Sequence, residues 1–339
     1  MERVPHPRGA TTDALLEALA RPPHRLAPIP LPDADDPLAG EDLQLALYLC
    51  YELHYRGLPG VDERWEWSPA LLAVRQALEE RFEAALRAAV GPIGELPTPG
   101  DMDVALRAVA DADPGPSLSR YVEREATLEQ VLEFVAHRSA YQLKEADPHA
   151  WAIPRLEGPP KAALVEIQAD EYGGGRPERM HSRLFADAMA ALGLDPTYGA
   201  YLDGIPGVTL ATVNLMSLCG LHRRLRGAIT GHLALFEMTS SLPNRRYASA
   251  VRRLGFDDPR ATEFFDEHVT ADAVHENIAA VDLAGGLARQ EPALAADVLW
   301  GARALVELEG RWARHLLEAW SAGRSSLLAP LGAPSPAPA

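Results

Sequence analysis

Two histidines and one aspartate lie on one side of a predicted helix. The stretch FFDEHVTADAVHENI, which begins at Phe264, places His268, Asp272 and His275 at spacings of four and three. At roughly 100° per residue, His275 lies about 20° to one side of His268 and Asp272 about 40° to the other. Phe264 and Phe265 flank the same direction, so the three polar residues lie at the face that should be buried. Metal binding explains this pattern, but so does a helix whose polar residues cap or pair locally.

Other predicted helices carry acidic or imidazole side chains in phase with their apolar residues. Glu171, for example, follows Ile167 by four positions. Asp170 and Glu166 are alternative inward residues on that helix. Glu145 lies in LKEADPH, which also fits a helix end in solvent. The candidate inward residues are Glu145, Glu171, His181 and Glu237.

Several carboxylates in one core require positive charge beside them. Burial of a single unpaired carboxylate costs several kcal/mol. Two divalent ions would balance the three inward glutamates and the helical aspartate, with the three neutral imidazoles as further ligands. Mixed carboxylate and imidazole ligation suits iron or manganese, whereas structural zinc usually has thiolate ligands. The two cysteines, Cys50 and Cys219, have no partner at ligand spacing. These residues therefore predict a pair of transition-metal ions.

The same residues resemble those of a known enzyme family, the heme-oxygenase-like diiron oxidases and oxygenases, often labelled iron-containing redox enzymes. The resemblance extends over about residues 120–325 and preserves the order of the residues on successive core helices. The family includes bacterial N-oxygenases, a 1-alkene-forming fatty-acid decarboxylase and amino-acid-cleaving oxidases. The resemblance implies a heme-oxygenase-like helical fold and two iron ions. The implied iron ligands are Glu171, His181, Glu237, His268, Asp272 and His275, with Glu145 resembling an additional ligand of the N-oxygenase members.

One departure from the compact family pattern lies between Glu171 and His181. Ten positions separate them, across YGGGRPERM. The glycines must therefore loop out if both side chains are to reach one metal ion. This feature also resembles the N-oxygenase type.

Composition limits the classes of protein to be considered. The chain has 339 residues, 47% of them hydrophobic, which is enough for one sizeable core domain with a smaller appendage. Its formal net charge of -16 opposes binding to nucleic acid or to anionic membranes. The start of the sequence has no signal-peptide pattern, and its most apolar stretch is interrupted by HRRLR. We therefore expect a cytoplasmic protein that acts on a small molecule.

Dense helix signals and sparse strand signals predict an all-α protein. Ser68 and Pro69 mark the start of one helix, and Thr127 with Gln130 forms a capping-box pattern at another. The predicted helices span residues 11–21, 41–57, 68–90, 127–146, 161–172, 178–193, 207–241, 264–278 and 291–323.

The predicted organisation is an N-terminal helical extension and a core domain. The extension covers residues 1–115, the heme-oxygenase-like diiron domain residues 116–325, and a disordered tail residues 326–339. The extension has no assignable motif. In relatives such an extension is an added helical or dimerising portion, so a homodimer is one alternative.

The expected activity, implied by the resemblance, is that of a non-heme diiron oxidoreductase with O2 as co-substrate and a role in specialised metabolism. N-hydroxylation, desaturation and oxidative C–C cleavage of a small organic substrate are the open reaction types. No nicotinamide or flavin motif is present, so electrons come from an external donor or from the substrate. The alternatives are a metal-free helical enzyme or binding protein for a cationic small molecule, a metal-storage or interaction protein, and a heme protein.

Overall fold

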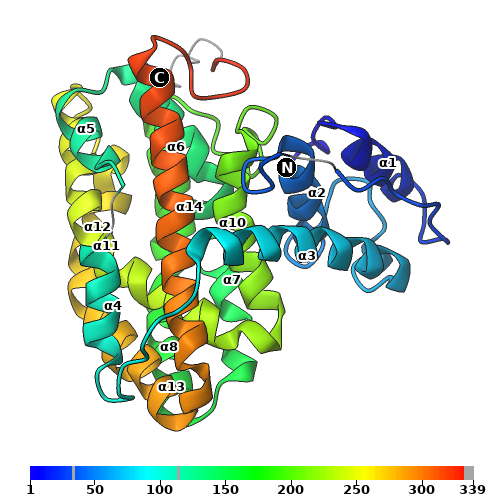
Figure 1. Cartoon of the computed structure of the whole chain (residues 1–339). Helices are drawn as coiled ribbons and strands as arrows, with labels where there is room; N and C mark the ends of the chain where they lie inside the picture. The colour runs from blue at the N-terminus through cyan, green and yellow to red at the C-terminus, as the bar shows by residue number, and fades with distance from the viewer. Residues whose placement is uncertain (33–34, 113–114, 332–339) are drawn as a thin grey trace.

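The computed structural model describes residues 1–32, 35–112 and 115–331, apart from the side chains of residues 272–274. Every regular element in this part of the chain is helical, which confirms the all-α prediction. Long helices form a bundle, and the N-terminal helices lie at one side of it (Figure 1). None of the described helices is both long and apolar enough to span a membrane.

The N-terminal helices are joined to the bundle by a shared core. They are α1 (Ala10–Leu19), α2 (Glu41–Glu52) and α3 (Pro69–Val90). Leu45 and Leu47 of α2 belong to the same buried cluster as Leu210 and Leu215 of α10 (Gly207–Leu221). Asn214 of α10 also donates a hydrogen bond to the main-chain oxygen of Gln44, at 2.8 Å.

Helix α11 (Arg226–Arg253) packs most extensively against α12 (Arg260–Asn277) and α14 (Ala295–Ser321). A π-helix, η6 (Ile278–Ala284), continues α12 and packs against α8 (Gly158–Glu171) and α11. The remaining α-helices are α4 (Met102–Asp111), α5 (Leu118–Arg124), α6 (Leu128–Gln142), α7 (Asp147–Ala150), α9 (His181–Ala191) and α13 (Gly285–Gln290). Short 3-10 turns span Glu63–Trp65, Ile153–Arg155, Gly173–Gly175, Pro177–Arg179, Arg223–Leu225 and Pro292–Leu294.

The single helix predicted over residues 207–241 is wrong, because the chain forms two helices there. His222 has an extended backbone at the end of α10, with ψ near 114°, and α11 begins after a short turn. Two contacts fix this turn to α3: the His222 ring lies 2.9 Å from Glu79, and Arg224 pairs with Glu83. Helix α11 then continues through Pro243 to Arg253, beyond the predicted end.

Local capping signals agree with the structure. Thr127 accepts a hydrogen bond from the Gln130 N–H, and the Gln130 side chain accepts one from the Thr127 N–H, so the predicted capping box is confirmed. Ser68 is the N-cap of α3 and Pro69 its first residue, although the Ser68 side chain makes no capping hydrogen bond. Helices α4 and α5, which lie between Pro-rich and Gly-rich segments, were not predicted.

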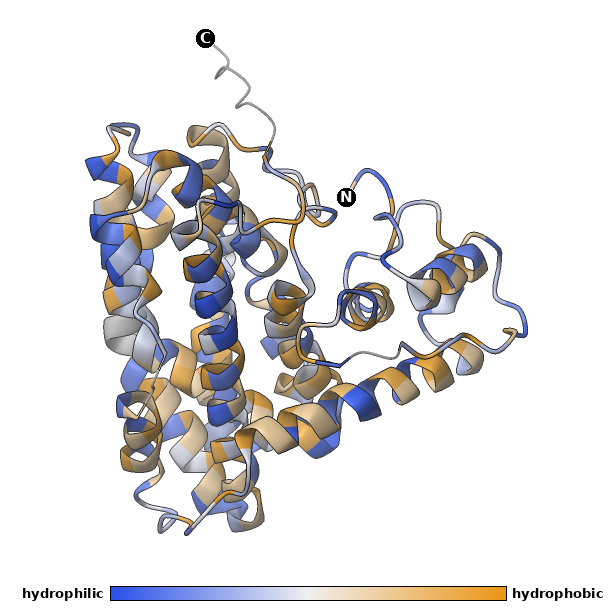
Figure 2. Ribbon diagram, turned by 45° about the horizontal axis from the view of Figure 1, so that its top comes forward, coloured by the Kyte–Doolittle hydropathy of each residue, from blue (hydrophilic) through white to orange (hydrophobic). Residues whose placement is uncertain are grey.

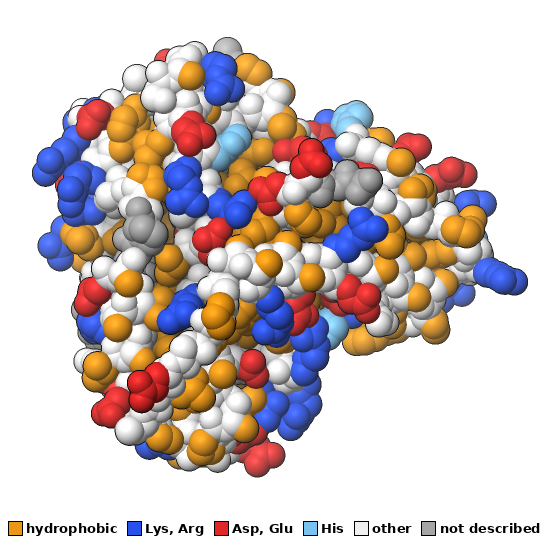
Figure 3. Space-filling model, in the orientation of Figure 1, with side chains coloured by type: hydrophobic (Ala, Val, Ile, Leu, Met, Phe, Trp, Pro, Cys, Tyr) orange, Lys and Arg blue, Asp and Glu red, His pale blue; other side chains and the backbone are white. Residues whose placement is uncertain are grey.

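Most helices carry hydrophobic and hydrophilic residues on different faces (Figure 2). On the surface seen in Figure 3, acidic and basic side chains are interspersed, so the negative charge does not form a single patch on this face.

The segment predicted as a tail begins with buried residues. Ser326 and Leu327 are buried, and the Ser326 hydroxyl donates a hydrogen bond to Glu133 at 2.6 Å. Residues 332–339 lie outside the described residues.

Candidate metal centre

A glycine loop brings Glu171 and His181 together. Glu171 is the last residue of α8, and His181 is the first of α9. The three glycines between them, residues 173–175, all have positive φ, a conformation that side chains with a Cβ rarely adopt. A Cβ at Gly173 would lie 2.6 Å from the carbonyl carbon of Arg179. The loop therefore folds back on itself, and His181 Nδ1 lies 3.0 Å from Glu171 Oε2.

Helix α12 contributes two buried histidines. His268 and His275 are each 5% exposed. The main-chain oxygen of Phe264 accepts a hydrogen bond from His268 Nδ1 at 2.8 Å, which makes Nε2 the ring nitrogen that could act as a ligand. That Nε2 lies 3.5 Å from Glu145 Oε1. Asp272 belongs to the same helix, and its side chain lies outside the described residues.

Two further carboxylates come from other elements. Glu145 lies in the turn between α6 and α7 and is 4% exposed, so a solvated helix end does not describe it. Glu237 lies on α11 and is 6% exposed. Its Oε2 lies 3.5 Å from His275 Nδ1. Thus the turn at Glu145 and the helices α8, α9, α11 and α12 all direct side chains to one place.

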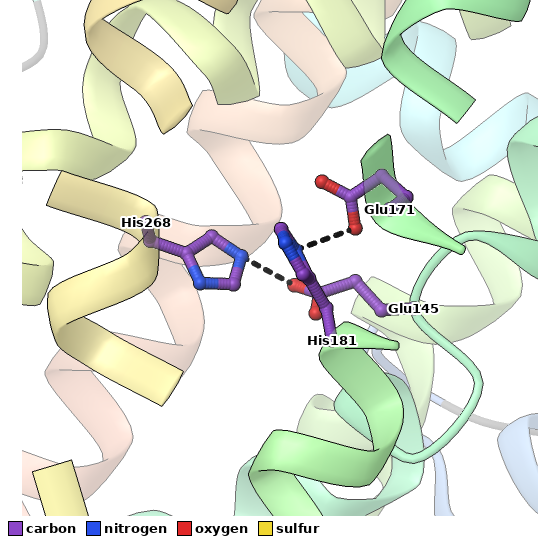
Figure 4. A group of neighbouring side chains, drawn as sticks. All are labelled: Glu145, Glu171, His181 and His268. Atoms are coloured by element: carbon purple, nitrogen blue, oxygen red, sulfur yellow. Dashed lines mark ion pairs between the residues drawn. The ribbon is translucent and has the colours of Figure 1, made fainter. Parts of the chain in front are cut away.

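The potential ligands form two overlapping groups. In each group, one ligand atom from every residue lies within 4.8 Å of the others. The first group is drawn in Figure 4, where the side chains of Glu145, Glu171, His181 and His268 converge from separate segments. The second group contains Glu171, Glu237 and His275. Glu171 belongs to both groups, so the two candidate ion sites share one carboxylate.

The residues pass a test of fit for metal ions. His181 Nδ1 and Glu171 Oε2 lie 3.0 Å apart, yet neither atom has a hydrogen-bond partner among the described residues. Glu145 Oε2 and His275 Nδ1 are likewise buried without one. Buried polar atoms are costly unless something satisfies them. A cation bound between these lone pairs would satisfy them, and an oxygen and nitrogen ligand set suits iron.

The charges of these groups depend strongly on one another. Burial acts to raise the pKa of Glu171, but His181, His268 and His275 outweigh burial and lower it to about 2. Burial acts to lower the pKa of His181, but the neighbouring Glu171 carboxylate outweighs burial and raises it. The pKa of His275 is raised in the same way, against burial, by Glu237. Burial raises the pKa of Glu237. A metal ion would take the place of the protons that these groups share.

The cavity between the ligands also has lining residues that the sequence analysis missed. Its volume is about 10 Å³, room for a water-sized occupant and not for an organic substrate. His149, Gln168 and Tyr141 line it with the carboxylates. Both amide atoms of Gln168 are buried with no hydrogen-bond partner among the described residues. Spacing could have revealed two of them, because Gln168 precedes Glu171 by three and His149 follows Glu145 by four.

The alternative inward residues on α8 lie elsewhere. Glu166 is exposed, and the Asp170 side chain is 46% exposed. Asp170 nevertheless contacts the site, because its Oδ2 lies 3.3 Å from His275 Nε2, on the ring edge opposite Glu237. Carboxylates in this position orient a ligating histidine. Glu171 is therefore the inward residue of α8, and Asp170 contacts His275 at the ring nitrogen that faces away from Glu237.

Two other histidines, His232 and His315, have partners outside the two ligand groups. His232 is buried, and its Nδ1 lies 3.2 Å from His149 Nε2. Burial lowers the pKa of His149 to about 4 and that of His232 well below the usual value, so both rings are neutral at pH 7. His315 Nε2 lies 2.8 Å from the main-chain oxygen of Ser326.

Comparison with known proteins assigns the family. The sequence profile described as iron-containing redox enzyme matches residues 132–310, more than half of the chain, and this range includes all seven predicted ligands. The chain is also 29% identical over 138 residues to nitrosourea synthase of Streptomyces achromogenes subsp. streptozoticus. That match covers 40% of this chain and 29% of the synthase, so the chain spans less than a third of its length. The chain belongs to the iron-containing redox enzyme family, as its residues and helical fold lead one to expect.

Proposed function

We propose that the protein is a non-heme diiron enzyme that uses O2 to oxidise a small organic substrate. The observation that carries this proposal is the pair of overlapping ligand groups that share Glu171. Glu145, His181 and His268 would hold one iron, Glu237 and His275 the other, and Glu171 both. The helical position of Asp272, between the two histidines of α12, makes it a further ligand in this proposal. The iron ions would supply the redox chemistry with O2, and the chain the geometry around them.

A second cavity offers space for the substrate. It has a volume of about 220 Å³ and shares Phe236 and Ser240 with the cavity between the ligands. This space is about twenty times that of the water-sized cavity between the ligands, which is enough for a small organic molecule. Arg138 lines it and is held by Glu309 through two hydrogen bonds of 2.9 and 2.6 Å. We propose that the substrate lies here, with its reacting atom directed past Phe236 and Ser240.

The reaction remains a choice among N-hydroxylation, desaturation and oxidative C–C cleavage. Similarity to a nitrosourea synthase makes N-oxidation the first reaction to test. An external reductant or the substrate would supply electrons. In this proposal the enzyme acts in specialised metabolism.

Anaerobic titration with ferrous iron, followed by oxygen, tests the proposal. We expect stoichiometric uptake of two iron ions per chain and a transient visible absorption band after oxygen is added. Elemental analysis of the reconstituted protein measures the iron directly. Absence of stoichiometric iron uptake would support the metal-free alternative. Accumulation of an iron core without turnover of an organic substrate would support metal storage.

A further inference from the structure

A buried ion pair links the N-terminal helices to the residue next to Glu145. Lys144 Nζ donates a hydrogen bond to Glu52 Oε2 at 2.9 Å. The exposed fractions of the two side chains are 1% and 0%. Glu52 is the last residue of α2, and Lys144 lies in the turn between α6 and α7. The pair therefore joins two segments that are 92 positions apart in the sequence.

Aromatic side chains surround this pair. The Tyr198 hydroxyl donates a second hydrogen bond to Glu52 Oε2, at 2.7 Å. The Lys144 ammonium lies 4.3 Å from the ring centre of Tyr55 and 4.8 Å from that of Tyr48. Such contacts hold a desolvated cation in place. The Lys144 side chain thus has one defined position in the core.

A second contact acts on the same turn. Arg56 donates a hydrogen bond to the main-chain oxygen of Leu143 at 2.7 Å and lies over the ring of Tyr198 at 4.2 Å. Leu143 and Lys144, which directly precede Glu145, are therefore both held by residues at the end of α2 or just after it, namely Arg56 and Glu52. Successive residues in a helical turn point about 100° apart. Lys144 can consequently face α2 while Glu145 faces His268.

Stability alone does not explain a buried ion pair. Replacing such a pair by apolar residues of similar size is often neutral or stabilising. The location beside Glu145 supplies another reason, because groups that orient a ligand affect metal binding strongly. We propose that Glu52, Lys144 and Arg56 are positioning residues that set the place of Glu145 for one of the two iron ions. This inference rests on the proposed function and gives the N-terminal helices, which precede the family match, a part in the metal centre.

Stepwise ferrous iron affinity of the full-length chain, measured anaerobically, tests this role. In Glu52→Gln we expect one iron site to weaken by about 10-fold, the lower end of the effect of losing a group that contacts a ligand, because Glu52 acts on Glu145 through Lys144. The other site should remain unchanged, and Glu145→Gln should weaken the same site. Glu41→Gln is the matched control. It removes the ion pair between Glu41 and Arg8, at 2.7 Å, and Arg8 also donates a hydrogen bond to the main-chain oxygen of Ile205 at 2.8 Å.

Glu52→Gln leaves the Lys144 ammonium buried without its partner and risks unfolding. The double variant Glu52→Gln/Lys144→Met removes both charges and keeps similar shapes. Arg56→Met leaves that ion pair in place and removes the hydrogen bond to Leu143 together with the cation over the Tyr198 ring. Circular dichroism identifies the folded variants. Folded variants that bind both irons as tightly as the wild type would overturn the inference and leave the proposed function intact. Wild-type protein that binds no iron would overturn both.

Discussion

His268 has one ring nitrogen fixed by its own helix and the other directed at the metal centre. Its Nδ1 bonds to the main-chain oxygen of Phe264, and its Nε2 lies 3.5 Å from Glu145. This arrangement selects the tautomer that a metal ligand needs. Removal of the ring should affect metal binding without disturbing the helix that carries it.

We predict that His268→Ala loses iron binding and activity together while its helicity stays close to the wild type. Iron content after anaerobic reconstitution and far-UV circular dichroism measure the two effects. His222→Ala is the control, because this partly exposed ring contacts Glu79 at 2.9 Å and lies outside the ligand groups. Retention of two irons per chain in His268→Ala would contradict the assignment.

Asp170 acts on the site through His275. The Asp170 carboxylate lies 3.3 Å from His275 Nε2, while the other ring nitrogen, Nδ1, faces Glu237. Asp170 therefore fixes the orientation of the His275 ring. We predict that Asp170→Asn lowers ferrous iron affinity by about 10-fold or more, as loss of such a contact usually does. Glu166→Gln, an exposed position on the same helix, should leave the affinity unchanged. Equal affinities in the two variants would show that Asp170 has no such role.

At the scale of elements, α11 and α14 cross where both are glycine. A Cβ at Gly231 would lie 1.9 Å from the main-chain oxygen of Val298, and a Cβ at Gly301 2.0 Å from that of Ala228. The two backbones therefore approach too closely for any side chain. This crossing sets the position of α11, which carries Glu237.

We predict that Gly231→Ala or Gly301→Ala lowers the free energy of unfolding by about 1–3 kcal/mol, the usual cost of overpacking a core. Urea denaturation measures the change, and iron titration reports any shift of Glu237. Gly94→Ala is the control, because nothing lies within 4 Å of a Cβ built there. Superimposable denaturation curves for all three variants would contradict the close crossing.

For the whole molecule, one buried cluster includes residues of α2 and α3 together with residues of α10, α11 and α14. The fragment 116–331 would expose the apolar face of α10 that α2 covers. Apolar patches larger than a few hundred Å² are rare on monomers and favour aggregation.

We predict a single cooperative thermal transition for the full chain by calorimetry, and aggregation of the fragment 116–331. The shared core is the reason, because unfolding either the N-terminal helices or the bundle would expose apolar side chains of the other. Two separate transitions, or a soluble fragment that binds two irons, would instead support an independent N-terminal domain.

The sequence by itself determined the helical class and the inward direction of those candidate ligands whose side chains the structure describes. Helical phase and neighbouring apolar residues depend only on local order in the chain, so Glu171, His181 and His275 could be placed on buried faces in advance. The cost of buried charge then required cations among them. Likewise, the glycines at 173–175 indicated a looped connection before its shape was seen.

Only the tertiary structure decided which of these residues meet. It placed Glu171 in both ligand groups, set Asp170 behind His275, and paired Lys144 with Glu52 across 92 positions. It also divided the apolar run after residue 207 into two helices, through contacts from α3 that the run itself does not contain. The physical reason is that periodicity gives each side chain a direction on its own helix. The distance between side chains on different helices depends on how those helices pack, which the whole core determines.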